Sequence, residues 1–127
     1  MLIRTEFGNT IGGYTHYPWS SEGGYLSDSS TRVFLFSLDL EEKYKPIRTD
    51  RLIYRKGNYG PCFGGDICIV DDCDKNRSSY AMFPSSFNKE GPIKYPQNQE
   101  SYHLFSGAKD GYYFKILEWE VFRIEFL

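Results

Sequence analysis

The clearest alternation of polar and apolar residues lies near the end of the chain. Over 115–121 the sequence reads Lys-Ile-Leu-Glu-Trp-Glu-Val. Because side chains on a β-strand point alternately to opposite faces, this segment is predicted to be a strand with Trp119 facing the core and Glu118 and Glu120 on the other face. From Phe122 the apolar positions shift by one residue, which predicts a β-bulge there.

Shorter apolar runs, separated by glycine, proline and polar residues, predict further strands upstream. Strands are expected over residues 2–6, 10–14, 32–38, 51–55, 66–70, 78–82, 102–106 and 112–120. The connections are expected as a hairpin turn at 7–9, a Gly/Ser loop at 20–30, a solvated or helical turn at 39–48, a long irregular stretch at 84–99, and a closing hairpin turn at 107–111. The whole pattern predicts a mainly β fold, a two-layer antiparallel β-sandwich.

A glycine-rich segment precedes the predicted strand at 66–70. Gly60, Gly64 and Gly65 can each adopt a positive φ, and the ring of Pro61 restricts its own φ. In a P-loop or a dinucleotide-binding fingerprint the glycines open a helix, whereas here they lead into a strand. We therefore expect a tight β-connection packed against aromatic rings, and no nucleotide site.

The composition fits a single β-rich domain over residues 1–127. A chain of this length can bury one hydrophobic core, and aromatic residues, which pack well on pleated sheets, make up 18% of it. Cys62, Cys68 and Cys73 are odd in number and form no Cys-x-x-Cys motif. We therefore expect reduced thiols, with neither a disulfide framework nor a zinc site.

The charge and hydropathy of the chain argue against two kinds of partner. The net charge is −2 and no cluster of lysine and arginine is present, so we predict no nucleic-acid partner. The longest apolar run, at 33–38, is far shorter than the roughly 20 residues that cross a bilayer, and residues 1–4 do not begin a signal peptide. We therefore expect no membrane span and a cytoplasmic location.

Three oxygen-bearing residues have the spacing of a calcium-binding loop. Asp72, Asp74 and Asn76 stand where the first three ligands of such a loop would stand. However, Arg77 replaces the glycine that makes the sharp turn, and Phe83 replaces the bidentate glutamate. A polar turn is therefore preferred, and no metal or other cofactor is expected.

Two sets of residues have the chemistry of catalytic groups. Cys62 could act as a nucleophile with His103, since such pairs meet in space rather than in sequence, but a small buried thiol is the commoner outcome. Glu118 and Glu120 resemble a glycosidase pair in type, yet such carboxylates normally face each other across a cleft. We expect an exposed or structural role for both glutamates and no enzyme activity, with a hydrolase built on Cys62, His103 and a carboxylate as the alternative.

Motifs along nearly the whole chain resemble, in their order and spacing, those of the TLDc domain family. The matching segments are Gly12-Gly13-Tyr14 with Trp19, Phe34-Leu35-Phe36-Ser37-Leu38, Tyr59-Gly60-Pro61, Phe63-Gly64-Gly65-Asp66-Ile67, Ser79-Tyr80 and Glu118-Trp119-Glu120-Val121-Phe122. The resemblance implies the same β-sandwich with a few short helices. It also favours Trp19 as a plug that closes one end of the sandwich over a role in binding a sugar or a partner.

The resemblance also carries expectations about function. It implies a non-catalytic protein-interaction module linked to oxidative-stress resistance; several TLDc domains bind the vacuolar proton-pumping ATPase and regulate its assembly. We expect a protein partner, this ATPase or another multi-subunit assembly, with Glu118 and Glu120 as the candidate interaction surface. The alternatives are a carbohydrate-binding β-sandwich and a structural subunit of a larger complex. The chain opens at what resembles the family's first hairpin, without the helical segment that usually precedes this hairpin. We expect that the chain is either a piece of a longer protein or a version of the domain that lacks this helical cover.

Overall fold

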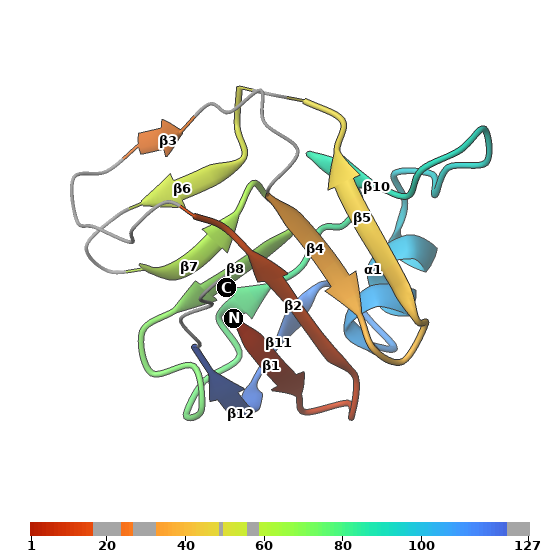
Figure 1. Ribbon diagram of the computed structural model, residues 1–127. Helices are drawn as coiled ribbons and strands as arrows, with labels where there is room; N and C mark the ends of the chain where they lie inside the picture. The colour runs from red at the N-terminus through yellow and green to blue at the C-terminus, as the bar shows by residue number, and fades with distance from the viewer. Residues whose placement is uncertain (17–23, 27–32, 49, 56–58, 122–127) are drawn as a thin grey trace, which may run out of the picture.

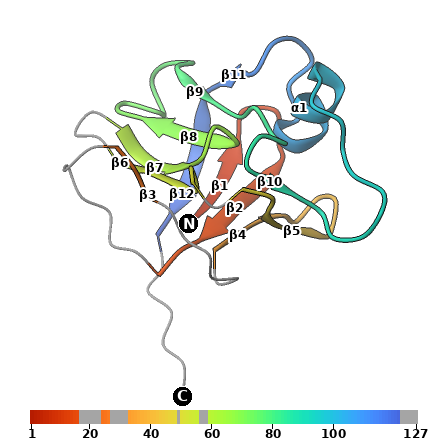
Figure 2. The ribbon, with the colours of Figure 1, turned by 90° about the horizontal axis from the view of Figure 1, so that it is seen from above.

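Two antiparallel sheets pack face to face in the computed structural model, which describes residues 1–16, 24–26, 33–48, 50–55 and 59–121 (Figure 1, Figure 2). In spatial order, the first sheet consists of β10 (Phe87–Asn88), β5 (Glu42–Pro46), β4 (Phe34–Ser37), β2 (Thr10–Tyr14), β1 (Leu2–Thr5) and β12 (Ile116–Glu120). The second consists of β11 (Tyr113–Phe114), β9 (Ser79–Tyr80), β8 (Ile67–Val70), β7 (Tyr59–Phe63), β6 (Ile53–Arg55) and β3 (Gly24–Leu26). The predicted mainly β, two-layer antiparallel fold is confirmed.

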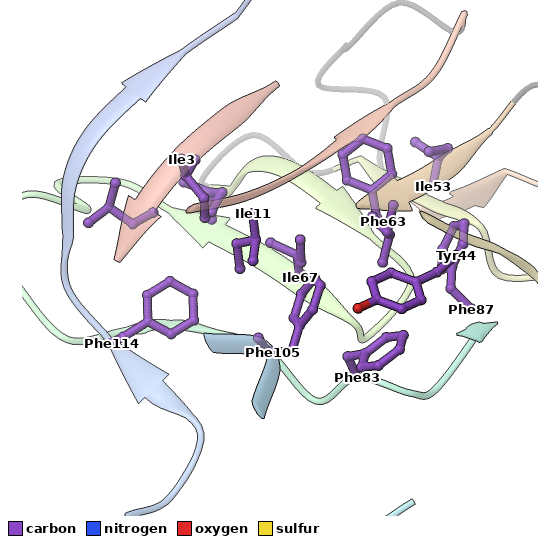
Figure 3. Packing of buried hydrophobic residues seen from close by; sticks show 14 of the residues in the cluster. Ile3, Ile11, Tyr44, Ile53, Phe63, Ile67, Phe83, Phe87, Phe105 and Phe114 are labelled. Atoms are coloured by element: carbon purple, nitrogen blue, oxygen red, sulfur yellow. The ribbon is translucent and has the colours of Figure 1, made fainter. Parts of the chain in front are cut away.

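Buried aromatic and aliphatic side chains fill the space between the sheets (Figure 3). The ring of Tyr44 lies 4.4 Å from that of Phe83, which in turn stacks at 4.8 Å on Phe105. Ile3 and Ile11 face each other across β1 and β2 and are at most 1% exposed. Burying each such side chain contributes about 1.5–3 kcal/mol, so this cluster supplies the main driving force for folding.

The first predicted hairpin is confirmed, and its turn is tied to the rest of the molecule. Gly8 has a φ of +93°, which the absence of a Cβ allows, and β1 returns as β2 with Arg4 opposite Thr10. The Asn9 side-chain amide donates to the backbone oxygens of Leu104 and Phe105 at 3.1 and 3.2 Å. The turn therefore holds the first sheet against a distant segment of the chain.

Residues 99–106 form a helix, α1 (Gln99–Ser106), where a strand over 102–106 was expected. The Asn98 side chain accepts from the Ser101 N–H at 3.0 Å and caps the first turn, and Gly107, with a φ of +83°, ends the last one. Phe105 is buried while its neighbour Leu104 is 44% exposed. Asn98 and Gly107 are residue types typical of helix caps, but the apolar residues between them favoured the prediction of a strand.

The segment expected as a solvated turn at 39–48 contains the strand β5. Its one strongly apolar position, Tyr44, is fully buried and stands opposite Leu35 of β4. Lys43 and Lys45 lie on the other face. Because only one face of this strand is covered, its sequence resembled that of a charged turn.

Among the described residues, no helix has both the length and the apolar character that a membrane-spanning helix requires.

Candidate functional site

The glycine-rich segment is a β-hairpin. Residues expected as a loop form the strand β7, and the turn that follows, closed by the Asp66 N–H donating to the Phe63 oxygen at 3.0 Å, leads into β8. The predicted tight β-connection is therefore present, but Gly64 and Gly65 lie against serine side chains, and Gly60 lies against Ile69, rather than against aromatic rings.

The same hairpin places Cys62 opposite Cys68, and the two are joined by a disulfide with their Cα atoms 4.2 Å apart. This corrects the expectation of three reduced thiols. Their spacing alone could not reveal the pairing, because it depends on the hairpin register. Cys73 is the free cysteine, and burial, with a smaller contribution from Asp74, raises the pKa of its thiol, which favours the inert protonated form.

The conformational restriction lies at Gly64 alone among the three glycines of this segment. Gly64 has a φ of +59°, and a Cβ there would lie 2.8 Å from the Ser86 Oγ. Gly60 and Gly65 lie outside the left-handed region, and a Cβ at either would meet its nearest neighbour at 3.5 Å, an ordinary contact. Of the three glycines that can adopt a positive φ, only Gly64 does so.

Asp66 fixes the segment that joins β9 to β10. Its carboxylate is fully buried and accepts from the backbone N–H groups of Ser85, Ser86 and Phe87 at 2.8, 2.7 and 3.1 Å. Burial raises the pKa of Asp66 to about 7, while the three N–H donors act in the opposite direction. The resemblance marked Asp66 as a motif position, and its role in this structure is to fix the chain before β10.

Gly12 and Gly13 allow close packing on the two faces of β2. A Cβ at Gly12 would lie 2.2 Å from the backbone oxygen of Met1 and 2.5 Å from Cζ of Phe36. A Cβ at Gly13 would lie 2.8 Å from Cζ of Phe63, which is itself fully buried. The motif positions Gly13 and Phe63 thus serve the core, whereas Gly12 allows close packing on the other face of β2. Trp19 lies outside the described residues.

The closing strand β12 carries large apolar side chains that are exposed. It is the outermost strand of its sheet, beside β1 (Figure 1). Trp119 lies opposite the buried Ile3, so its predicted direction toward the inner face is right, but its side chain is 54% exposed. The expectation of a core tryptophan was therefore wrong. Leu117 and Val121 are exposed to 50% and 54%, which the alternation could not indicate.

Glu118 and Glu120 are both exposed, on the outer face of the same strand. Glu118 forms an ion pair with Arg4 at 3.1 Å, and Glu120 stands opposite Leu2. Exposed pairs of this kind contribute about 0–1 kcal/mol, so neither carboxylate is needed for folding. A shallow hollow of about 140 Å³ lies around them, lined by Leu2, Ile3, Arg4, Thr10, Glu118, Trp119 and Glu120.

The strand also carries a bulge, at Leu117. Thr5 pairs with Ile116 although Arg4 pairs with Glu118, so one residue of β12 has no counterpart in β1. Thr5 is buried, and its hydroxyl donates to the backbone oxygen of Ser106 at 2.7 Å. The bulge predicted at Phe122 lies outside the described residues.

The candidate calcium residues form the polar turn that was preferred for them. The N–H groups of Lys75 and Asn76 donate to the backbone oxygen of Asp72 at 2.8 and 3.2 Å. The Asn76 side-chain oxygen accepts from the Ser78 N–H at 3.0 Å, so one of the three proposed ligands is engaged in the turn itself.

The candidate nucleophile and base lie on different elements. Cys62, on β7, is fully buried and its sulfur is bonded to Cys68, so it is not a free thiol in this structure. His103 lies on α1, with Nε2 3.0 Å from the backbone oxygen of Gly111.

A second hollow, of about 380 Å³, lies on the other sheet. It is lined by Val70, Arg77, Ser78, Tyr80 and Tyr113. Tyr113 is 51% exposed, and Arg77 forms an ion pair with Glu6 at 2.8 Å. The hollow therefore combines the exposed ring of Tyr113 with the guanidinium group of Arg77, whose charge is paired with Glu6.

The two packed sheets, the close glycine contacts and the closing acidic strand agree with one known class of domain. The family model of the TLDc domain matches residues 1–125, and the chain belongs to this family. No curated protein and no solved structure matches the chain.

Proposed function

We propose that this TLDc domain is a non-catalytic protein-interaction module that binds the vacuolar proton-pumping ATPase, or another multi-subunit assembly, in the cytoplasm, and through it contributes to oxidative-stress resistance. Family membership over residues 1–125 supports the class of function. The binding surface is the β12 edge, which we define as Leu117, Glu118, Trp119, Glu120 and Val121.

One observation carries the proposal: every residue of the β12 edge is exposed, although three of them are large and apolar. Neighbouring exposed apolar side chains with a polar rim are typical of protein-binding surfaces. Tryptophan is enriched among the residues that dominate binding energy. Trp119, with a glutamate on each side, is the expected centre of the interface.

Charge reversal tests this surface. The variant Glu118→Lys with Glu120→Lys should fail to capture the purified vacuolar ATPase, while its Tm stays within about 2 °C of the parent because both side chains are exposed. The matched control is Glu41→Lys with Glu100→Lys, which makes the same change in charge at two exposed positions away from β12, in the turn before β5 and in the first turn of α1. The proposal fails if both double variants capture the ATPase equally well.

Carbohydrate binding is the second candidate, and the hollow beside Tyr113 favours it. A half-exposed tyrosine ring offers a flat apolar face on which a sugar ring can stack. Titration with a panel of glycans, followed by intrinsic fluorescence, distinguishes the two candidates: saturable quenching that Tyr113→Ala abolishes supports a sugar site, and unchanged emission supports the interaction module.

A further inference from the structure

We propose that a segment of the partner, in an extended conformation, pairs with β12 and adds a further strand to the first sheet. This segment carries basic residues at alternate positions. This inference rests on the proposed function and specifies how the β12 edge is used. It depends on the direction of the backbone groups of β12, the faces of its side chains and its charge.

The backbone directions follow from the hydrogen bonds on either side of β1. The Gly13 N–H donates to the Met1 oxygen and the Thr5 N–H donates to the Asn9 oxygen, so the groups of residues 1 and 5 point toward β2. The N–H and C=O of one strand residue point the same way, and successive residues alternate, so the groups of Leu2 and Arg4 point toward β12.

The partners of Leu2 and Arg4 in β12 are Glu120 and Glu118, whose backbone groups therefore point back toward β1. Those of Trp119, the residue between them, point away from the sheet. The Ile116 N–H, which also points outward beyond the bulge, donates to the Cys73 oxygen at 2.9 Å. The outer edge of β12 is thus occupied at its start, while the described residues provide no partner for the Trp119 groups.

The side chains specify what would pair there. An added strand continues the two faces of the sheet, so its residues would alternate between the face of Trp119 and the face of Glu118 and Glu120. Apolar side chains suit the first face and lysine or arginine suits the second. Both glutamates line the shallow hollow together with Arg4, the ion-pair partner of Glu118, so a cation on this face of the added strand would lie on the same side of the sheet as the two carboxylates. The expected occupant is an extended segment in which basic and apolar residues alternate.

A second copy of this chain fits the edge less well. Antiparallel pairing of β12 with itself around Trp119 would place Glu118 of one chain opposite Glu120 of the other. Like charges directly opposite one another on a sheet are destabilising. The acidic face therefore favours a basic partner over self-association.

Hydrogen exchange with a synthetic peptide tests the inference. The probe is acetylated Lys-Val-Lys-Val-Lys-Val amide, and the control is a peptide of the same composition with three lysines followed by three valines. The alternating peptide should bind saturably and slow exchange of the Trp119 amide, while the amides of Glu118 and Glu120, already directed at β1, should change little. The control peptide should leave the Trp119 amide unprotected.

A matched pair of variants isolates the backbone contribution. β12 ends at Glu120, and continuing its alternation by one residue directs the Val121 N–H outward, like that of Trp119. Val121→Pro removes this donor, while Val121→Ala removes only the side chain. Peptide binding by the proline variant should be about tenfold weaker than by the alanine variant, since the peptide loses a hydrogen bond.

Three outcomes would overturn strand addition: no saturable binding of the alternating peptide, binding without protection of Trp119, or equal affinity of the two Val121 variants. If the ATPase is still captured through Glu118 and Glu120 in any of these cases, the proposed function survives and only its binding mode is wrong. If Trp119 is protected by the peptide but no ATPase is captured, strand addition stands and the proposed partner is wrong.

Discussion

Gly64 shows how one residue constrains a hairpin through its backbone. An alanine there would adopt a left-handed conformation and place a Cβ within 2.9 Å of both Ser86 and Asp66. The conformation alone costs about 1–2 kcal/mol for a residue with a side chain. Gly64→Ala should therefore lower the free energy of unfolding by about 2 kcal/mol, measured by urea denaturation. Gly65→Ala, with a nearest contact at 3.5 Å, should cost under about 1 kcal/mol, and equal losses would contradict the assignment.

Asp66 links the stability of the fold to pH. Its folded-state pKa of about 7 lies above the value of about 3.9 in an unfolded chain, so the folded state retains a proton that the unfolded state has released. The contribution of Asp66 to the free energy of unfolding should therefore fall as the pH rises from about 4 to about 7. Carbon NMR of the Asp66 carboxyl group should show a titration midpoint near 7. A midpoint below 4 would show that the three N–H donors outweigh burial.

At the scale of single residues, the sequence identifies the special positions but not which of them is constrained. Gly64 and Gly65 are equivalent as residue types, and only the hairpin geometry separates them. Asp66 was recognisable as a motif residue, whereas its three backbone partners come from a segment 19 to 21 residues further along the chain. Contacts of that kind leave no local pattern.

At the scale of elements, β12 and α1 each carry a large aromatic residue, Trp119 and Phe105, and the two differ in burial. Phe105 is fully buried and Trp119 is 54% exposed. Phe105→Ala should therefore cost about 3–5 kcal/mol, while Trp119→Ala should cost well under half of that. Thermal unfolding of the two variants measures the difference. A Trp119→Ala variant as unstable as Phe105→Ala would mean that the tryptophan belongs to the core and not to the binding surface.

Element prediction succeeded where one face of a strand is buried and failed where tertiary contacts decide. The alternation around β12 located the strand and the directions of its side chains. It could not show that β12 stands at the end of its sheet, and so it assigned Trp119 to the core. In α1, the buried Phe105 and the caps at Asn98 and Gly107 determine a helix, whereas the apolar residues alone suggested a strand.

At the scale of the whole molecule, the two-layer architecture was predictable because turn residues recur at short intervals between apolar runs. The disulfide and the exposed edge were not, since both depend on which strands become neighbours. The candidate surface was found only in part: Glu118 and Glu120 were proposed from the sequence, but the three apolar members of the β12 edge were placed in the interior or left unassigned.

Site-specific photo-crosslinking tests the central claim, that the partner binds at the β12 edge. The photoreactive residue p-benzoylphenylalanine is introduced at Trp119 in one variant and, as the control, at Ile93, which is 73% exposed in the stretch at 84–99. Each variant is irradiated with the purified vacuolar ATPase, and the products are resolved by mass spectrometry. We expect an adduct between position 119 and an ATPase subunit, and none from position 93. An adduct from position 93 without one from position 119 would place the interface elsewhere and contradict binding at the β12 edge.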